Sequence, residues 1–223
     1  LREYPRPDIE VDETDYGLKI TALRHMDADL THVRVTNCIF PDAICIPMSR
    51  EMTITQWHVP LDRHHCYWYT MFTSFNEPVN KELMRSQRLS EHNLPEYSPK
   101  KNKANNYKYD PIEQKNLTYT GMGLDINVHD QWAVEMMGSV QDRTREHLGR
   151  SDKAIVRYRR MFRKAMASLG KGDIDNLPMR KMSCREIVGP LSNDAISPTH
   201  QWKTKSHEAD LERRDLCPWD ASV

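Results

Sequence analysis

One acidic residue, Asp130, lies in a stretch of the sequence that is otherwise largely apolar. The helical spacing i, i+3, i+4, i+7 is met by Asp130, Ala133, Val134 and Met137. We therefore expect a helix that places the carboxylate on the face that Val134 and Met137 bury. A carboxylate in an apolar layer is costly unless a positive charge meets it. Two interpretations stay open: a residue near the helix start that accepts backbone N–H groups, or a metal ligand.

The densest group of soft metal ligands is His64-His65-Cys66. Adjacent residues on a strand point to opposite faces, so the two histidines cannot both reach one metal without a bulge. An exposed turn is the favoured interpretation. The sequence contains no G-x-S-x-G, no glycine-rich phosphate loop and no H-E-x-x-H pattern, and it has only eight glycines. These absences argue against a nucleophile-elbow hydrolase, a P-loop protein and a zincin.

Other charged and aromatic residues allow weaker hypotheses. Arg24 and Arg34 could bind a substrate carboxylate, although a surface position is the commoner role of strand arginines. The basic residues of 157–164 surround their predicted helix without an aromatic platform, so a solvated face or subunit interface is favoured over a nucleic-acid site. The aromatic residues of 57–75 alternate across a predicted hairpin. Most should be core, and one face could line an apolar cavity.

Composition excludes several partner classes. The 223 residues suffice for one full domain or a domain with an arm, and Lys plus Arg equals Asp plus Glu at 32 each. No net field therefore favours nucleic acid or an acidic membrane surface. Five widely spaced cysteines without a C-x-x-C pair indicate reduced thiols in the cytoplasm. No membrane-spanning run or signal peptide is evident, and the start at Leu1 suggests a piece of a longer protein.

The pattern of apolar residues predicts an antiparallel sheet. Residues 4–15 read as an extended lead-in, and strands are expected at 16–24, 32–38, 39–47, 51–59 and 66–75. Pro41 and Pro47 suit a bent or edge strand at 39–47. A short polar connection at 60–65 is of hairpin type. The predicted fold class is thus α+β, with an antiparallel β-sheet and C-terminal helices packed on it.

The second half of the chain is predicted to be a loop, two helices and an arm. Residues 76–126 read as a loop over a pocket mouth or a subunit contact. Helices are expected at 129–147, interrupted near Gly138, and at 151–169. The buried stripe of the second helix is predicted to contain Ile155, Tyr158, Phe162, Ala165 or Met166, and Leu169. We expect residues 1–170 to form one domain part and residues 171–223 an extended polar arm.

Short motifs in a fixed order support a resemblance to a known family. The most specific is Asp142-Arg-Thr-Arg-Glu-His-Leu-Gly149, followed by Ser151-Asp152. Other matching stretches lie at 13–19, 31–36, 58–62, 119–123, 129–131, 135–138, 151–156 and 159–160. Together they resemble the C-terminal part of the catalytic domain of Rieske non-haem iron aromatic-ring-hydroxylating oxygenase large subunits, in the phthalate 4,5-dioxygenase-like group. The resemblance implies a helix-grip-like catalytic domain.

The resemblance also implies a metal and partners. In that family a mononuclear Fe(II) is held by two histidines and one carboxylate, and Asp130 matches the position of the carboxylate. Electrons come from NAD(P)H through a separate reductase or ferredoxin and a Rieske [2Fe-2S] cluster. Relatives form trimers or larger assemblies. This sequence has no match to the family's iron-binding histidines or to its Rieske ligands, so the chain alone should be catalytically incomplete.

The implied activity is O₂-dependent hydroxylation, or oxidative O-demethylation, of an aromatic or similar ring, as in the catabolism of aromatic compounds. The alternative is a non-catalytic helix-grip module that binds a ligand and has lost its metal site. A nucleic-acid-binding domain that uses the basic helix is a third and weaker possibility. Iron binding by Asp130 distinguishes the first two.

Overall fold

The computed structural model describes residues 3–27, 29–178, 180 and 192–217. The chain forms two compact units: a sheet unit of residues 1–78 and 147–223, and a helical unit of residues 79–146. Cys184 and residues 181–191 of the expected arm lie outside the described residues. Cys38, Cys45, Cys66 and Cys217 are free thiols.

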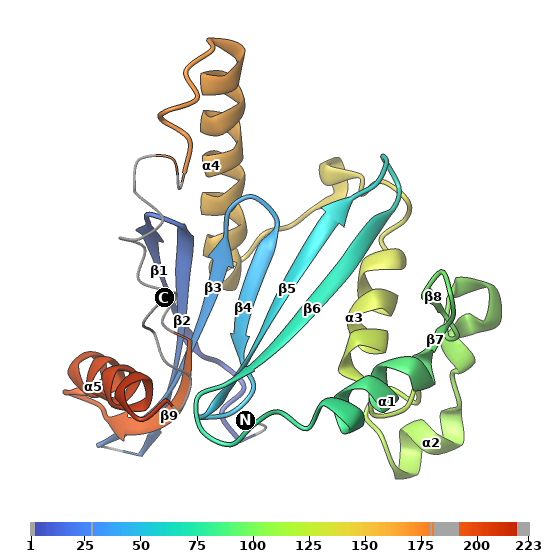
Figure 1. The fold of residues 1–223 in the computed structure, drawn as a ribbon, viewed down its shortest axis with the longest axis horizontal. Helices are drawn as coiled ribbons and strands as arrows, with labels where there is room; N and C mark the ends of the chain where they lie inside the picture. Colours follow the sequence, from blue (N-terminus) through green and yellow to red (C-terminus); the bar gives the residue numbers. More distant parts are fainter. Residues whose placement is uncertain (1–2, 28, 179, 181–191, 218–223) are drawn as a thin grey trace. The chain divides into compact units, whose positions relative to one another are not determined.

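A seven-stranded antiparallel sheet forms the centre of the sheet unit (Figure 1). Its strands are β1 (Asp8–Thr14), β2 (Gly17–Asp27), β3 (Leu30–Ile39), β4 (Ala43–Pro47), β5 (Met52–Pro60), β6 (Cys66–Ser74) and β9 (Asn193–Pro198). The first six follow one another in chain order, and β9 pairs with β3. The segment expected as an extended lead-in is in fact β1, which pairs with β2 along its whole length.

Strand β3 has two different partners on the same side. Its residues 30–35 pair with β9, and its residues 37–39 pair with β4. Strand β4 in turn pairs with β5, so it is an interior strand; of the two alternatives predicted for 39–47, a bent or an edge strand, the edge strand is wrong. Pro41 precedes β4 and Pro47 is its last residue, so neither proline interrupts the ladder between β4 and its neighbours.

The alternation of β2 and β3 builds the main apolar layer. Leu23, Val33 and Val35 form a buried cluster, with at most 5% of any of them exposed. Leu23 and Val33 are directly opposite one another in the ladder and therefore share a face. Helix α5 (Trp202–Asp215) covers this face, because Trp202 packs against the cluster.

Residues 171–223 were expected to form an extended polar arm, but they include regular structure. Asn193–Pro198 is strand β9 of the sheet, and Trp202–Asp215 is helix α5. The helix is polar on most sides and has few buried residues, so its sequence has no strong apolar stripe to mark it. Asp210 is 6% exposed and is paired with Arg213 and Arg214, which places a charged cluster inside this part of the unit.

Helix α4 (Lys153–Gly170) packs on the sheet near β1 and β2. The ring of Phe162 lies 4.8 Å from that of Phe40, and Lys153 Nζ donates to the carbonyl of Ile9 at 3.2 Å. Ala165 is buried, as predicted for the helix stripe. Met166 and Leu169, also expected in that stripe, are 67% and 53% exposed. The stripe is therefore buried only in its middle.

The helical unit contains three short helices, α1 (Lys81–Glu91), α2 (Pro111–Asn116) and α3 (Ile126–Glu135). Between α1 and α2 lie a small hairpin with two-residue strands, β7 (His92–Asn93) and β8 (Ser98–Pro99), and a 3₁₀ segment at Lys103–Lys108. The prediction of a loop over 76–126 is therefore wrong. Polar side chains cap the helix starts, since Asn80, Asp110 and Asp125 each accept a backbone N–H.

The helix predicted at 129–147 is shorter and starts earlier. It begins at Ile126, and Glu135 is its last residue. Gly138 follows at a φ of +93°, a conformation that ends a helix and that other residues rarely adopt. The α+β fold class is confirmed. Within the described part of the chain, no helix has the length and apolar character needed to cross a membrane.

Candidate functional site

Helix α3 carries Asp130, and its start is fixed by a charged contact. Asp125 caps the helix, with Oδ1 accepting the N–H of Asn127 at 2.9 Å. The other oxygen of Asp125 pairs with the guanidinium of Arg88 on α1. Only 10% of the Asp125 side chain is exposed, so this ion pair is shielded from water and ties α3 to α1.

One face of α3 is anchored in the small core of the helical unit. Val128 is buried against Tyr107 and Met122. Two turns further, Glu135 accepts a hydrogen bond from the Tyr107 hydroxyl and another from Gln131 Nε2 at 2.9 Å. Burial, together with the neighbouring Glu135 carboxylate, raises the pKa of Tyr107 to about 12.

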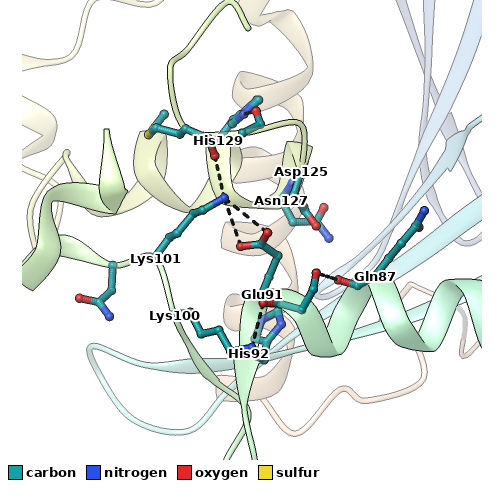
Figure 2. A network of polar contacts seen from close by, with 12 residues as sticks. Gln87, Glu91, His92, Lys100, Lys101, Asp125, Asn127 and His129 are labelled. Carbon is teal, nitrogen blue, oxygen red and sulfur yellow. Dashed lines mark hydrogen bonds and ion pairs between the residues drawn. The ribbon is translucent and has the colours of Figure 1, made fainter. Parts of the chain in front are cut away.

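His129 is held by the loop that precedes α3 (Figure 2). Its Nε2 lies 2.9 Å from the Gly123 carbonyl oxygen and 2.9 Å from Thr120 Oγ1. A carbonyl oxygen can only accept a hydrogen bond, so Nε2 carries a proton and has no lone pair with which to bind a metal. His129 therefore acts as a structural residue that fixes the loop to the helix.

A lysine completes this polar network. Lys101 Nζ donates to the carbonyl oxygen of Met122 at 3.0 Å and lies 3.3 Å from a carboxylate oxygen of Glu91 (Figure 2). Both side chains are less than 20% exposed. Glu113 of α2 accepts hydrogen bonds from the Gly123 N–H at 2.7 Å and from the Thr118 hydroxyl at 2.6 Å. These hydrogen bonds, that of Thr118 first, lower the pKa of Glu113.

The opposite face of α3 presents Asp130. On a helical projection this face also contains Ala133 and Val134, and it lies opposite Val128 and Glu135; Met137 follows the end of the helix. Asp130 is exposed in this chain, and Val134 and Met137 are 62% and 52% exposed. The prediction that the chain buries this stripe is wrong. Apolar residues occur on every side of α3, so the periodicity could not identify the buried side.

The donors present do not complete a mononuclear iron site. Across the described ranges, no three His, Cys, Asp or Glu side chains come together in a way that could hold a metal. Asp130 supplies one carboxylate, where the family implies a carboxylate and two histidines. The histidines of the sheet do not fill the gap, because His25 lies 3.3 Å from Asp8 and His32 lies 2.6 Å from Asp194.

His64 and His65 occupy an exposed turn between β5 and β6, which confirms the prediction for this motif. Asp62 Oδ1 accepts the N–H of His64 at 2.6 Å and that of His65 at 2.8 Å. These bonds, that of His64 first, lower the pKa of Asp62 to about 2. The carboxylate thus organises the turn.

The two candidate arginines have different environments. Arg34 pairs with Asp194 of β9, so its charge is neutralised inside the sheet unit. Arg24 stands directly opposite His32 in the ladder, and its Nε and Nη1 atoms are buried without a hydrogen-bond partner in the described residues. Of the two, Arg24 keeps unused donors.

An antiparallel sheet with C-terminal helices is the fold class expected for the C-terminal catalytic part of a Rieske-type oxygenase large subunit. The chain belongs to the LigXa C-terminal domain like family, which matches residues 4–212. It is also 30% identical over 177 residues to the phthalate 4,5-dioxygenase oxygenase subunit of Pseudomonas putida. That alignment covers 75% of this chain and 39% of the relative. The resemblance predicted from the motifs is confirmed.

The residues that hold α3 in place were not predicted from the sequence. Asp125 and His129 fix the first half of the helix, and Tyr107 holds Val128 and Glu135, the last residue of the helix. Only Asp125 had a readable signal, since an Asp directly before an apolar helical segment is a typical N-cap. Tyr107 and the partners of His129 lie in connecting segments whose conformation the sequence does not specify.

Proposed function

We propose that this chain is the C-terminal part of the catalytic domain of a Rieske-type oxygenase that hydroxylates an aromatic or similar ring with O₂. The observation that carries the proposal is the family match over residues 4–212, together with the identity to a phthalate 4,5-dioxygenase oxygenase subunit. The chain spans about two-fifths of the length of that relative. Its activity, substrate and partners are therefore inferred for the longer assembly.

In this proposal Asp130 is the carboxylate ligand of the mononuclear Fe(II). The anchored face of α3 holds the helix in place, and Asp130 lies on the opposite, exposed face. The two histidine ligands and the Rieske [2Fe-2S] cluster would come from sequence outside these 223 residues. When bound, the iron would supply the site at which O₂ is activated beside the substrate.

The same proposal assigns partners and location. Electrons would come from NAD(P)H through a reductase or ferredoxin, and the oxygenase would be a homo-oligomer, with a trimer as the first expectation. The widely spaced cysteines and balanced charge suit the cytoplasm. Arg24 is a candidate for contact with a substrate carboxylate, because its buried guanidinium nitrogens lack partners among the described residues.

The ligand role is tested by anaerobic Fe(II) titration of the complete oxygenase subunit and its Asp130→Asn variant. Loss of a charged ligand should weaken iron binding by at least about tenfold, because outer residues alone contribute that much in metal sites. Asp15→Asn removes the same charge from an exposed turn of the sheet unit and serves as the matched control. Thermal unfolding of both variants shows whether the fold is retained.

Equal iron affinity in wild type and a folded Asp130→Asn variant would refute the ligand assignment. Wild-type protein that binds no iron at all would support the alternative, a ligand-binding module without a metal. The titration therefore separates the two functions before any substrate is known.

A further inference from the structure

A cavity of about 270 Å³ lies between the sheet and helix α5. Its lining comes from four strand residues, Asp12, Lys19, Thr21 and Val35, and four helix residues, Trp202, Lys203, Ser206 and His207. All eight belong to the sheet unit. No residue of α3 or of the helical unit contributes to the lining, so the cavity is built independently of Asp130.

The two lysines that line the cavity form only weak ion pairs. Lys19 Nζ lies 3.2 Å from Asp12, and Lys203 Nζ lies 3.6 Å from Glu10. The carboxylates of these pairs are 57% and 43% exposed. Exposed ion pairs contribute little to stability, so either ammonium can turn to another anion at small cost.

The inner wall carries a hydroxyl without a partner. Ser206 is 3% exposed, and its Oγ has no hydrogen-bond partner in the described chain. A buried hydroxyl left unpaired is unfavourable, and native structures rarely leave one without a reason. A ligand that brings a hydrogen-bonding group to this wall would remove that cost.

Trp202 and Val35 are the apolar residues of the lining. Trp202 packs on the Leu23, Val33 and Val35 cluster, and Val35 itself is 2% exposed. Lys203 Nζ lies 5.2 Å from the centroid of the Trp202 ring, so a cation stands beside the aromatic surface. The volume of about 270 Å³ is slightly below the range of about 300–1,000 Å³ that is typical of ligand pockets, which limits the ligand to about one ring with one small polar substituent.

We propose that this cavity binds a small carboxylate with a flat apolar body. The ring lies against Trp202 and Val35, the carboxylate accepts from Lys19 and Lys203, and Ser206 hydrogen-bonds the ligand at the inner wall. The ligand remains chemically unchanged at this site. The site does not rest on the proposed iron chemistry, because it shares no residue with α3.

Calorimetric titration with benzoate tests the proposal on the full-length protein. Benzoate should bind with a dissociation constant of about 1 mM or tighter, as expected for a ligand of this size. Benzamide, which has the same shape without the charge, should bind at least about tenfold more weakly. Ser206→Ala should weaken benzoate binding about three- to tenfold, and Lys19→Met at least about tenfold.

Two control variants locate the binding. Lys205→Met removes a lysine of α5 that pairs with Glu208 and does not line the cavity, so benzoate affinity should not change. Asp130→Asn should also leave it unchanged. Ser206→Ala should unfold at the same or a higher temperature than wild type, because it removes an unpaired buried hydroxyl.

Three results would overturn the proposal. The first is no benzoate binding by the wild-type protein at millimolar concentration. The second is binding that Asp130→Asn abolishes and the cavity variants retain, which would place benzoate at the proposed iron site. The third is a Ser206→Ala variant that is less stable yet binds benzoate normally, which would mean that Ser206 has only a structural role. None of these results bears on iron binding by Asp130.

Discussion

The two units of this chain are stabilised in different ways. In the sheet unit, apolar side chains are buried on both faces of the sheet: Leu23, Val33 and Val35 form one cluster, and Leu18, which points to the opposite face, is completely buried. In the helical unit, the buried apolar cluster contains only Tyr107, Met122 and Val128. The other contacts that stabilise this unit are polar, and they include the ion pairs of Asp125 with Arg88 and of Glu91 with Lys101.

This difference shows that the two units are specified by different features of the sequence. A strand that alternates apolar and polar residues specifies its own buried face, so the sheet follows from a local pattern. A unit held by caps and ion pairs depends on single residues that meet across loops. Its geometry is therefore sensitive to individual polar substitutions, and it is the unit that positions Asp130.

The largest expected effect is loss of a core side chain from the sheet. Leu18→Ala should lower the free energy of unfolding by about 3 kcal/mol, because it removes a completely buried side chain and leaves a cavity. Val128→Ala is the matched substitution in the helical unit and should cost about 1.5 kcal/mol, since it removes two methyl groups from a small cluster. Amide hydrogen exchange should show the loss of protection confined to the unit that carries each substitution. Similar losses throughout the chain would mean that the two units unfold together.

A smaller effect is expected at the start of α3. Asp125→Ala removes the helix cap and the partner of Arg88, so it should cost about 1–2 kcal/mol, measured by denaturant unfolding. Asp125→Asn keeps a good N-cap but removes the charge, and it should retain part of that stability. Equal stability of the two variants would show that the ion pair contributes all of the effect and the cap none.

The smallest effect is expected at the Tyr107 hydroxyl. Tyr107→Phe should cost about 1 kcal/mol, the usual net value of one hydrogen bond. The pKa of Tyr107 is raised in the folded state, so the stability that this group contributes is fully present below the ordinary pKa of 10.0 and is lost as pH rises toward about 12. Tyr107→Phe should therefore flatten the decline in stability over that range.

Ultraviolet titration of tyrosine ionisation checks the assignment. Tyr107→Phe should remove one group that ionises near pH 12. Tyr158→Phe is the control in the sheet unit, because burial also raises the pKa of Tyr158 to about 12. Loss of a group that ionises near the ordinary tyrosine pKa of 10.0, and not near 12, would place the Tyr107 hydroxyl in water.

The sequence predicted the sheet better than it predicted the site. The strands at 16–24, 32–38, 51–59 and 66–75 are all present, since each has the alternation or the hairpin connection that identifies a half-buried strand. Strand β9 and helix α5 were missed because they are polar and because β9 pairs with β3 across about 160 residues of chain. A pairing at that distance leaves no local signal.

The surroundings of Asp130 show more clearly what a local sequence pattern does not determine. Its place on a helix could be predicted, but the buried face of that helix could not, because Val128 and Val134 are equally apolar. The structure buries Val128 and exposes Val134. The choice depends on Tyr107 and Met122, whose approach is set by loops rich in Asn, Lys and Gly. A helical period identifies possible faces, and tertiary contacts select one of them.

The branched pairing of β3 has a consequence for biosynthesis. The hydrogen-bonding groups of residues 30–35 are satisfied by β9, a strand about 160 residues further along the chain. Until residue 198 has left the exit tunnel, the nascent sheet carries an unpaired strand edge in its middle, which is the kind of edge that recruits other chains. Termination before residue 193 should thus yield aggregated protein, and a holding chaperone would be needed until β9 has been made.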